Sequence, residues 1–333
     1  MNYFENIPIS KYRNAIYGIA TLGIIATHNS QYLSDIPNWI IKIKILRFGG
    51  SGVFIFAFLS GMGLFITLNR EYNIRKYYYH RLKRVFIPYF IISFLWYGYK
   101  YIIIEHNIPY FFYEWSTLSF WGSHQGAWYV AMLIPVYTIW PFFYQWVIKD
   151  FTRRTILSLA IIIILSEFLF YTNQDIAKHL SQITQSLIYF VLGNYIGKEV
   201  KDNTLKSLYW FIGGIIIIFI RFLTNNDNIE RFTTGIGGIC ITFAIAWILQ
   251  KINYKFNFFN LITNLFSHLG KYSLESYLTN IFILQAVKYF CFDKILIQLD
   301  PTGILIFILI AVVGILTAIG LSKVIDFIIL KRI

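Results

Sequence analysis

Stretches of about 20 mainly apolar residues, the length that an α-helix needs to cross the hydrocarbon core of a bilayer, follow one another along almost the whole chain. Backbone polar groups in lipid must be satisfied within a helix or a closed barrel, so these stretches are predicted to be membrane-spanning helices. We expect an all-α fold, a polytopic membrane helix bundle that forms a single transmembrane domain over residues 1–333. It would contain about ten spans, at residues 12–31, 50–69, 84–104, 127–147, 154–171, 183–198, 207–223, 232–250, 272–290 and 303–327.

The composition argues against a soluble protein. Of the 333 residues, 57% are hydrophobic and 14% are charged, whereas a soluble domain has about 25% charged residues. A net charge of +13 would suggest nucleic-acid binding in a soluble protein. In a membrane protein, cationic loops orient the spans instead. The lipid bilayer is therefore the expected partner, and no nucleic acid is expected.

The distribution of the 29 Lys and Arg residues predicts the orientation of the bundle. Most of them fall in alternate loops, and the loop at residues 105–126 contains none. Because cytoplasmic loops carry the excess of Lys and Arg, both termini are expected in the cytoplasm. The richness in Ile, Lys, Asn and Tyr is compatible with an AT-rich bacterial genome. We expect a multi-pass protein of a bacterial plasma (inner) membrane.

His28 is an ionisable residue inside the apolar stretch at residues 12–31. Such residues are rare in membrane spans and commonly functional, and imidazole titrates near neutral pH, which suits proton transfer. The alternative is a structural histidine that hydrogen-bonds to a neighbouring helix. Tyr17 lies eleven residues earlier, on nearly the same helical face and about 16 Å away along the axis. Arg13 lies one turn further, so one stripe would carry a cation, a phenol and an imidazole.

The segment at residues 70–84 is strongly basic, and Arg81 and Arg84 in it are one helical turn apart. It either anchors the topology or cradles a phosphate, since guanidinium groups bind phosphates bidentately. Tyr77, Tyr78 and Tyr79 precede these arginines and suit either a stacked nucleotide base or an interfacial aromatic belt.

Other polar residues form weaker signals. The small residues of the Ser60–Gly63 segment favour close helix packing. Polar and aromatic residues suggest an acceptor-side surface at the outer face, although such residues are common on any solvated surface; they are Glu105, His106, Glu114, His124, Trp128 and Tyr129. Ser273, Ser276 and Asn280 form a polar stripe that favours contacts between helices. No motif for a metal, a dinucleotide or a Walker-type loop is present, and neither a metal site nor a bound cofactor is expected.

Five segments, in this order, resemble motifs of the acyltransferase type 3 family of integral membrane acyltransferases. They are the first helix with His28, residues 54–61, residues 81–88, residues 128–130 and residues 270–280. The chain resembles the stand-alone form, without a fused extracytoplasmic domain. It departs from the family pattern at Tyr17, where arginine is usual, and at Asn280, where histidine is common.

This resemblance implies transfer of an acyl group, commonly acetyl, from cytoplasmic acyl-CoA to a hydroxyl of a cell-surface or lipid-linked carbohydrate. Acetyl-CoA would be a donor substrate, and glycan-synthesis proteins would be partners. His28 would be the general base, and Tyr17 would line its approach. The donor would contact Arg13, Ser60, Arg81 and Arg84, and the acceptor would lie near Glu105, His106, His124, Trp128, Tyr129 and Asn280. An exporter of polysaccharide or lipid-linked sugar and a structural membrane subunit remain the alternatives.

Overall fold

The fold is given by a computed structural model, and regular structure in the part of the chain that it describes is entirely helical. The described residues are 9–32, 51–122, 127–202, 209–210, 212–213, 215–216, 219, 227–255, 257–292, 295 and 304–327. Among these, six helical segments are long and apolar enough to cross a membrane: Ser51–Arg70, Ile74–Ile104, Trp128–Ile148, Phe151–Thr172, Gly235–Ile252 and Leu305–Ile325.

The all-α prediction is thus confirmed, whereas the prediction of about ten spans is not. Helices do occupy three further predicted stretches, namely α1 (Ile9–Tyr32), α11 (Gln174–Lys201) and α15 (Ser273–Tyr289). They do not combine the length and apolarity of the six segments. Each carries buried polar side chains, such as Asn29 in α1, Asn194 in α11 and Asn280 in α15. The predicted span at 207–223 lies largely outside the described residues.

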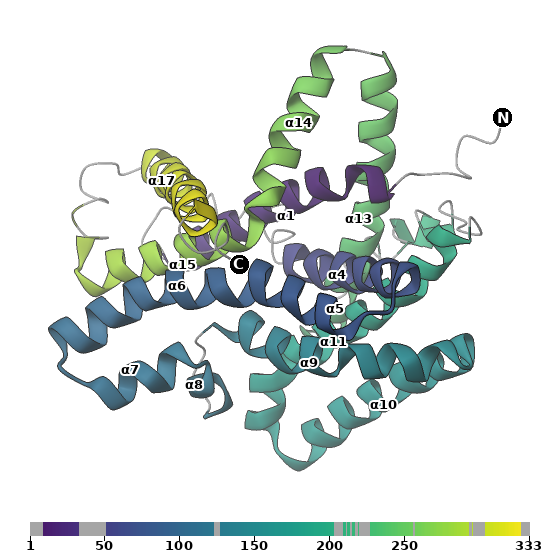
Figure 1. The fold of residues 1–333 in the computed structure, drawn as a ribbon, viewed down its shortest axis with the longest axis horizontal. Helices are drawn as coiled ribbons and strands as arrows, with labels where there is room; N and C mark the ends of the chain where they lie inside the picture. The colour runs from purple at the N-terminus through teal and green to yellow at the C-terminus, as the bar shows by residue number, and fades with distance from the viewer. Residues whose placement is uncertain are drawn as a thin grey trace.

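Helix α4 (Ser51–Arg70) lies at the centre of the bundle, where it packs against α1 and α11. Next along the chain, α5 (Ile74–Arg81), the π-helical segment η2 (Leu82–Phe86), α6 (Ile87–Tyr97) and the π-helical segment η3 (Gly98–Ile104) form one continuous rod. This rod crosses the molecule in Figure 1. The basic segment of the sequence is therefore the beginning of a long helix and not a flexible loop.

The remaining helices surround this centre (Figure 1). Short helices α7 (Ile108–Trp115) and α8 (Leu118–Trp121) lie beside the end of the rod. Helix α9 (Trp128–Ile148) is followed by α10 (Phe151–Thr172), which packs against α11. Helices α13 (Asp227–Lys255) and α14 (Asn257–Lys271) project together from the bundle, and α17 (Ile304–Ile325) packs against α15.

Helices α4 and α11 approach to backbone contact through glycines. A Cβ atom at Gly61 would collide with the carbonyl oxygen of Phe190, and one at Gly193 would collide with that of Phe58. Lipid provides no hydrophobic force between helices, so close packing of this kind supplies much of their attraction. The packing role predicted for the Ser60–Gly63 segment thus holds at Gly61.

A proline in α9 creates the attachment point for α5. Pro141 has no N–H, so the carbonyl of Tyr137, four residues earlier, lacks its helical donor. The Tyr77 hydroxyl donates to that carbonyl oxygen over 3.1 Å, and the Tyr78 hydroxyl donates to the carbonyl of Thr138 over 2.6 Å. These two phenols are therefore engaged by α9, which argues against their stacking on a nucleotide base.

We predict that Gly61→Ala lowers the thermal stability of the purified protein, because the new methyl group forces apart two helix backbones. Overpacking of this kind costs about 1–3 kcal/mol. Gly320→Ala is the matched control, since a Cβ there meets no atom within 4 Å. Thermal unfolding in detergent would contradict the packing argument if the two variants melted at the same temperature.

We also predict that Tyr77→Phe destabilises the protein by about 1–3 kcal/mol, because a buried carbonyl of α9 then has no donor. Tyr78→Phe removes the equivalent hydrogen bond from a more exposed position, so its effect is expected to be smaller. The check is the melting temperature of each variant in the same detergent. Equal losses for Tyr77→Phe and Tyr78→Phe would rule out a special role for the carbonyl that Pro141 leaves free.

Candidate functional site

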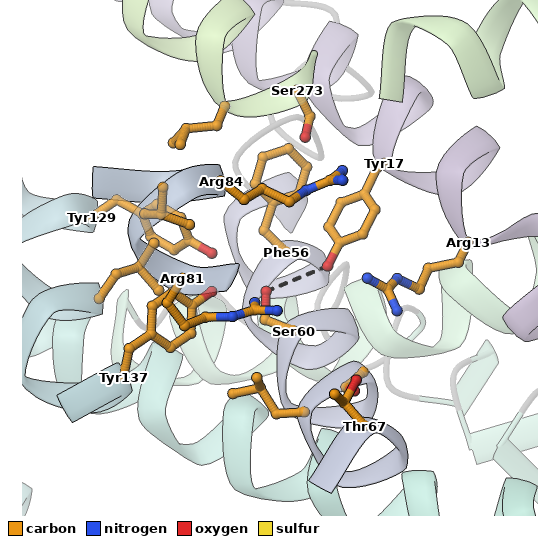
Figure 2. A pocket seen from close by; sticks show the side chains of 15 residues that line it. Arg13, Tyr17, Phe56, Ser60, Thr67, Arg81, Arg84, Tyr129, Tyr137 and Ser273 are labelled. Carbon is orange, nitrogen blue, oxygen red and sulfur yellow. Dashed lines mark hydrogen bonds between the residues drawn. The ribbon is translucent and has the colours of Figure 1, made fainter. Parts of the chain in front are cut away.

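A polar cavity lies where α1, α4, the start of the rod, α9 and the start of α15 meet (Figure 2). Its volume of about 100 Å³ is enough for several water molecules. The residues that line it are Arg13, Tyr17, Phe56, Ser60, Gly63, Leu64, Thr67, Arg81, Arg84, Val85, Tyr129, Leu133, Tyr137, Ser273 and Leu274.

Three arginines give the cavity its electrostatic character. Arg13, Arg81 and Arg84 come from different parts of the chain, and their guanidinium groups converge in Figure 2. No Asp or Glu is among the described residues of the lining. The Nε atoms of Arg13 and Arg81 are buried and have no hydrogen-bond partner in the described part of the chain. The buried carboxyl group of Glu275, next to Leu274 of the lining, interacts with Arg84. The lining itself carries only positive charge, which suits a multiply charged anion such as a phosphorylated ligand.

Aromatic rings hold two of these arginines. The Arg81 guanidinium lies 5.8 Å from the centre of the Tyr77 ring and 5.4 Å from that of Tyr137. The Arg13 guanidinium lies 5.6 Å from the centre of the Tyr17 ring. Cation–π attraction at these distances stabilises the cations without neutralising them, and their capacity to bind an anion is retained.

The glycine at position 63 leaves the room that Arg13 occupies. A Cβ atom at Gly63 would lie 2.6 Å from Nη1 of Arg13, too close for the arginine to keep its position. The arginine side chain reaches the cavity from α1, and α4 presents no side chain where it arrives. Gly63 therefore acts on the cavity through Arg13, and the close packing predicted for this segment does not describe its role here.

Ser60 places a hydroxyl group in the cavity, close to the phenol of Tyr17. Its hydroxyl oxygen lies 3.3 Å from the hydroxyl of Tyr17, the contact drawn in Figure 2. The side chains of Tyr129 and Tyr137 line the same cavity. The cavity thus combines guanidinium donors with hydroxyl groups, which suits an oxygen-rich ligand.

His28 lies outside the cavity lining, so only part of the predicted polar stripe on α1 faces the cavity. Arg13 and Tyr17 meet in the cavity, while His28 lies three turns further along the helix. Its ring centre is 5.8 Å from that of Tyr277, which is in turn 6.2 Å from that of Tyr129 in the cavity wall. Nδ1 of His28 is buried and has no hydrogen-bond partner among the described residues, so this nitrogen is not used as a contact between helices.

The predicted acceptor-side residues do not gather at one place. Glu105 and His106 are exposed at the end of the rod, where Glu105 lies 3.9 Å from Nζ of Lys100. Trp128 packs edge-to-face on Tyr129, with ring centres 5.7 Å apart, but does not line the cavity. Of the predicted set, Tyr129 alone lines it, and His124 lies outside the described residues.

Asn280 ties helices together. Its side-chain nitrogen donates to Oδ1 of Asn29 over 3.3 Å, and Nδ2 of Asn29 donates to the carbonyl of Phe307 over 3.1 Å. Asn280 and Asn29 are fully buried. The predicted role of this polar stripe as contacts between helices therefore holds at Asn280, which fixes α15 against α1 beside His28.

Sequence and structure agree with a single family. Residues 13–323 match the family model described as an acyltransferase domain. The chain belongs to the acyltransferase type 3 family. No curated protein and no solved structure matches it. The protein is thus a multi-pass membrane acyltransferase, as the five sequence segments predicted.

Several residues in or near the cavity of this acyltransferase were not predicted from the sequence. Tyr137 follows Tyr129 by eight residues, so it lies on the same face of α9, a spacing that was visible in the sequence. Tyr277 stands next to Ser276 in the predicted polar stripe. Gly63 matters only because Arg13 happens to reach it, which depends on how α1 and α4 pack and cannot be read from either segment alone.

We predict that Gly63→Ala leaves the acyltransferase folded but weakens anion binding several-fold, because the flexible end of Arg13 moves to make room. The check is thermal stabilisation by inorganic pyrophosphate, since a ligand that binds the folded state raises its stability. Gly98→Ala is the control, because a Cβ at Gly98 makes only ordinary contacts of 3.7 Å or more. Undiminished stabilisation of Gly63→Ala would exclude Arg13 from the anion site.

Proposed function

We propose that this protein transfers an acyl group, acetyl in the simplest case, from acyl-CoA to a hydroxyl of a cell-surface or lipid-linked carbohydrate in a bacterial plasma membrane. The observation that carries the proposal is the cavity in which Arg13, Arg81 and Arg84 converge. The family membership supplies the reaction class. His28, two ring contacts from that cavity, supplies a base.

The arginines account for the donor half of the reaction. Coenzyme A carries several phosphate charges, and a cavity with three guanidinium groups and no lining carboxylate among the described residues compensates such charges. The three arginines differ in exposure: Arg84 is exposed, whereas Arg13 and Arg81 are half-buried. We place the mouth of the cavity at Arg84 and the deeper phosphate contacts at Arg13 and Arg81.

His28 accounts for the acceptor half. As the acceptor hydroxyl attacks the thioester carbonyl, the imidazole takes its proton, and the new C–O bond forms a tetrahedral intermediate. Collapse of the intermediate breaks the C–S bond, and the imidazolium gives its proton to the departing thiolate. The products are an ester and free CoA, and His28 returns to its starting state. A positioned base of this kind typically contributes about 10²- to 10⁴-fold to the rate.

We predict that His28→Ala lowers acetyl-CoA cleavage and transfer by about 10²- to 10⁴-fold but leaves stabilisation by CoA unchanged. The double variant Arg81→Ala/Arg84→Ala is expected to lose stabilisation by CoA and turnover together. The measurements are CoA-dependent melting temperature and thioester cleavage in nanodiscs. His80→Ala is the control, because His80 is exposed and contacts the Tyr79 ring outside the cavity.

The two variants separate the alternatives. Near-wild-type turnover by His28→Ala would refute the role of the base. A folded wild-type protein that shows neither stabilisation by CoA nor thioester cleavage would overturn the transferase proposal, and would favour the exporter of polysaccharide or lipid-linked sugar.

A further inference from the structure

Two tyrosine rings separate the arginine cavity from His28. Tyr129 on α9 lines the cavity, and Tyr277 on α15 lies between Tyr129 and His28. Both side chains are buried, with 4% of Tyr129 and 3% of Tyr277 exposed. Their rings meet nearly edge-to-face at an interplanar angle of 76°. We refer to Tyr129 and Tyr277 as the tyrosine partition.

Neighbouring side chains hold the partition in place. The Tyr129 ring packs against Phe56 at 6.3 Å, and Phe56 packs against Tyr17 at 5.2 Å. Aromatic contacts therefore continue from the cavity to His28. The Asn29–Asn280 hydrogen bond fixes the helices that carry His28 and Tyr277 close to this point. A group that reaches His28 from the cavity must occupy the space that these rings define.

We propose that the tyrosine partition sets the length of acyl group that the protein accepts. This inference rests on the proposed function, because it takes the arginine cavity as the donor site and His28 as the base. A donor that enters from the arginine side has its acyl group as the leading end. The acyl group is therefore the part of the donor that must pass Tyr129 and Tyr277 as the thioester carbonyl comes to His28. An acetyl group adds one methyl group beside the rings. Each further methylene must displace a buried ring that is packed on both sides, since well-packed interiors have little free volume.

Tyr137 provides the internal comparison. It is a tyrosine of the same helix, is 3% exposed and lines the same cavity. Its ring, however, faces Arg81 at 5.4 Å, and no ring contact between Tyr137 and Tyr277 or His28 is found among the described residues. Replacement of Tyr137 should therefore weaken binding of every acyl-CoA alike, whereas replacement of a partition residue should change the preference among them.

The test compares acetyl-, butyryl- and hexanoyl-CoA with the full chain in nanodiscs. Thioester cleavage and affinity, measured by the melting temperature, are followed for wild type, Tyr129→Leu, Tyr277→Leu and Tyr137→Leu. We expect wild type to discriminate against each added methylene by about tenfold or more, the range for a pocket that is closed to an extra methylene. The two partition variants should bring the cleavage rates for the three acyl-CoAs closer together. Tyr137→Leu should leave the ratio of these rates unchanged.

Conservative variants protect the test against misfolding. Tyr129→Phe and Tyr277→Phe keep the rings, so they are expected to fold and to retain the wild-type ratio. Melting of each leucine variant without ligand shows which of them are folded. If either folded leucine variant kept the wild-type ratio, or if Tyr137→Leu changed it equally, the partition would be excluded as the determinant. Wild type that binds CoA and cleaves every chain length equally would overturn this inference alone. Absence of both binding and cleavage would overturn the proposed function.

Discussion

The arrangement of this protein depends on keeping three guanidinium groups in one cavity of an apolar bundle. Like charges in a medium of low polarity repel, and each loses part of its hydration. Aromatic ring faces stabilise the Arg81 and Arg13 guanidinium groups. The hydroxyl groups of Ser60 and Tyr17 also lie close together in the cavity. No carboxylate is among the described residues of the lining, so the lining stays positively charged.

The position of Arg81 and Arg84 depends on a backbone carbonyl of α9 that has no helical donor. Pro141 frees a carbonyl of α9, and Tyr77 satisfies it from α5. The rod is thereby fixed against α9 one turn before Arg81, and the same phenol ring lies beside the Arg81 guanidinium. The π-helical segment that follows carries Arg84. Segments of this kind are rare and often occur at functional sites. The basic segment thus serves two roles, because Arg81 and Arg84 line the cavity while Arg70 and Arg75 stay exposed.

The sequence predicted the helical class and the family. It also singled out five residues that line the cavity, namely Arg13, Tyr17, Ser60, Arg81 and Arg84, whereas Tyr129, which lines it too, was assigned to the acceptor side. The helical class and the family could be predicted because apolar length and short motifs are local properties of the sequence. The count of about ten spans is not confirmed among the described residues. Helices α1 and α15 exchange polar contacts such as Asn29–Asn280, so they need not be apolar throughout. The positions of Gly63 and Tyr277 follow from how helices pack. The sequence also did not reveal the π-helical turn at residues 82–86, because no local pattern distinguishes it from an α-helix.

Separation of His28 from the arginines has a chemical consequence. A base in contact with a wet cationic cavity would activate water as readily as an acceptor, and the thioester would be lost to hydrolysis. Two buried rings lie between the cavity and His28. In the proposed reaction they would keep the reacting end of the donor apart from the charged end that the arginines hold. Exclusion of water in this way also strengthens the electrostatic interactions inside a site. The proposed reaction takes its two substrates from opposite sides of the membrane. It would require such a division, because the donor must be bound firmly at one end and react only where the acceptor arrives.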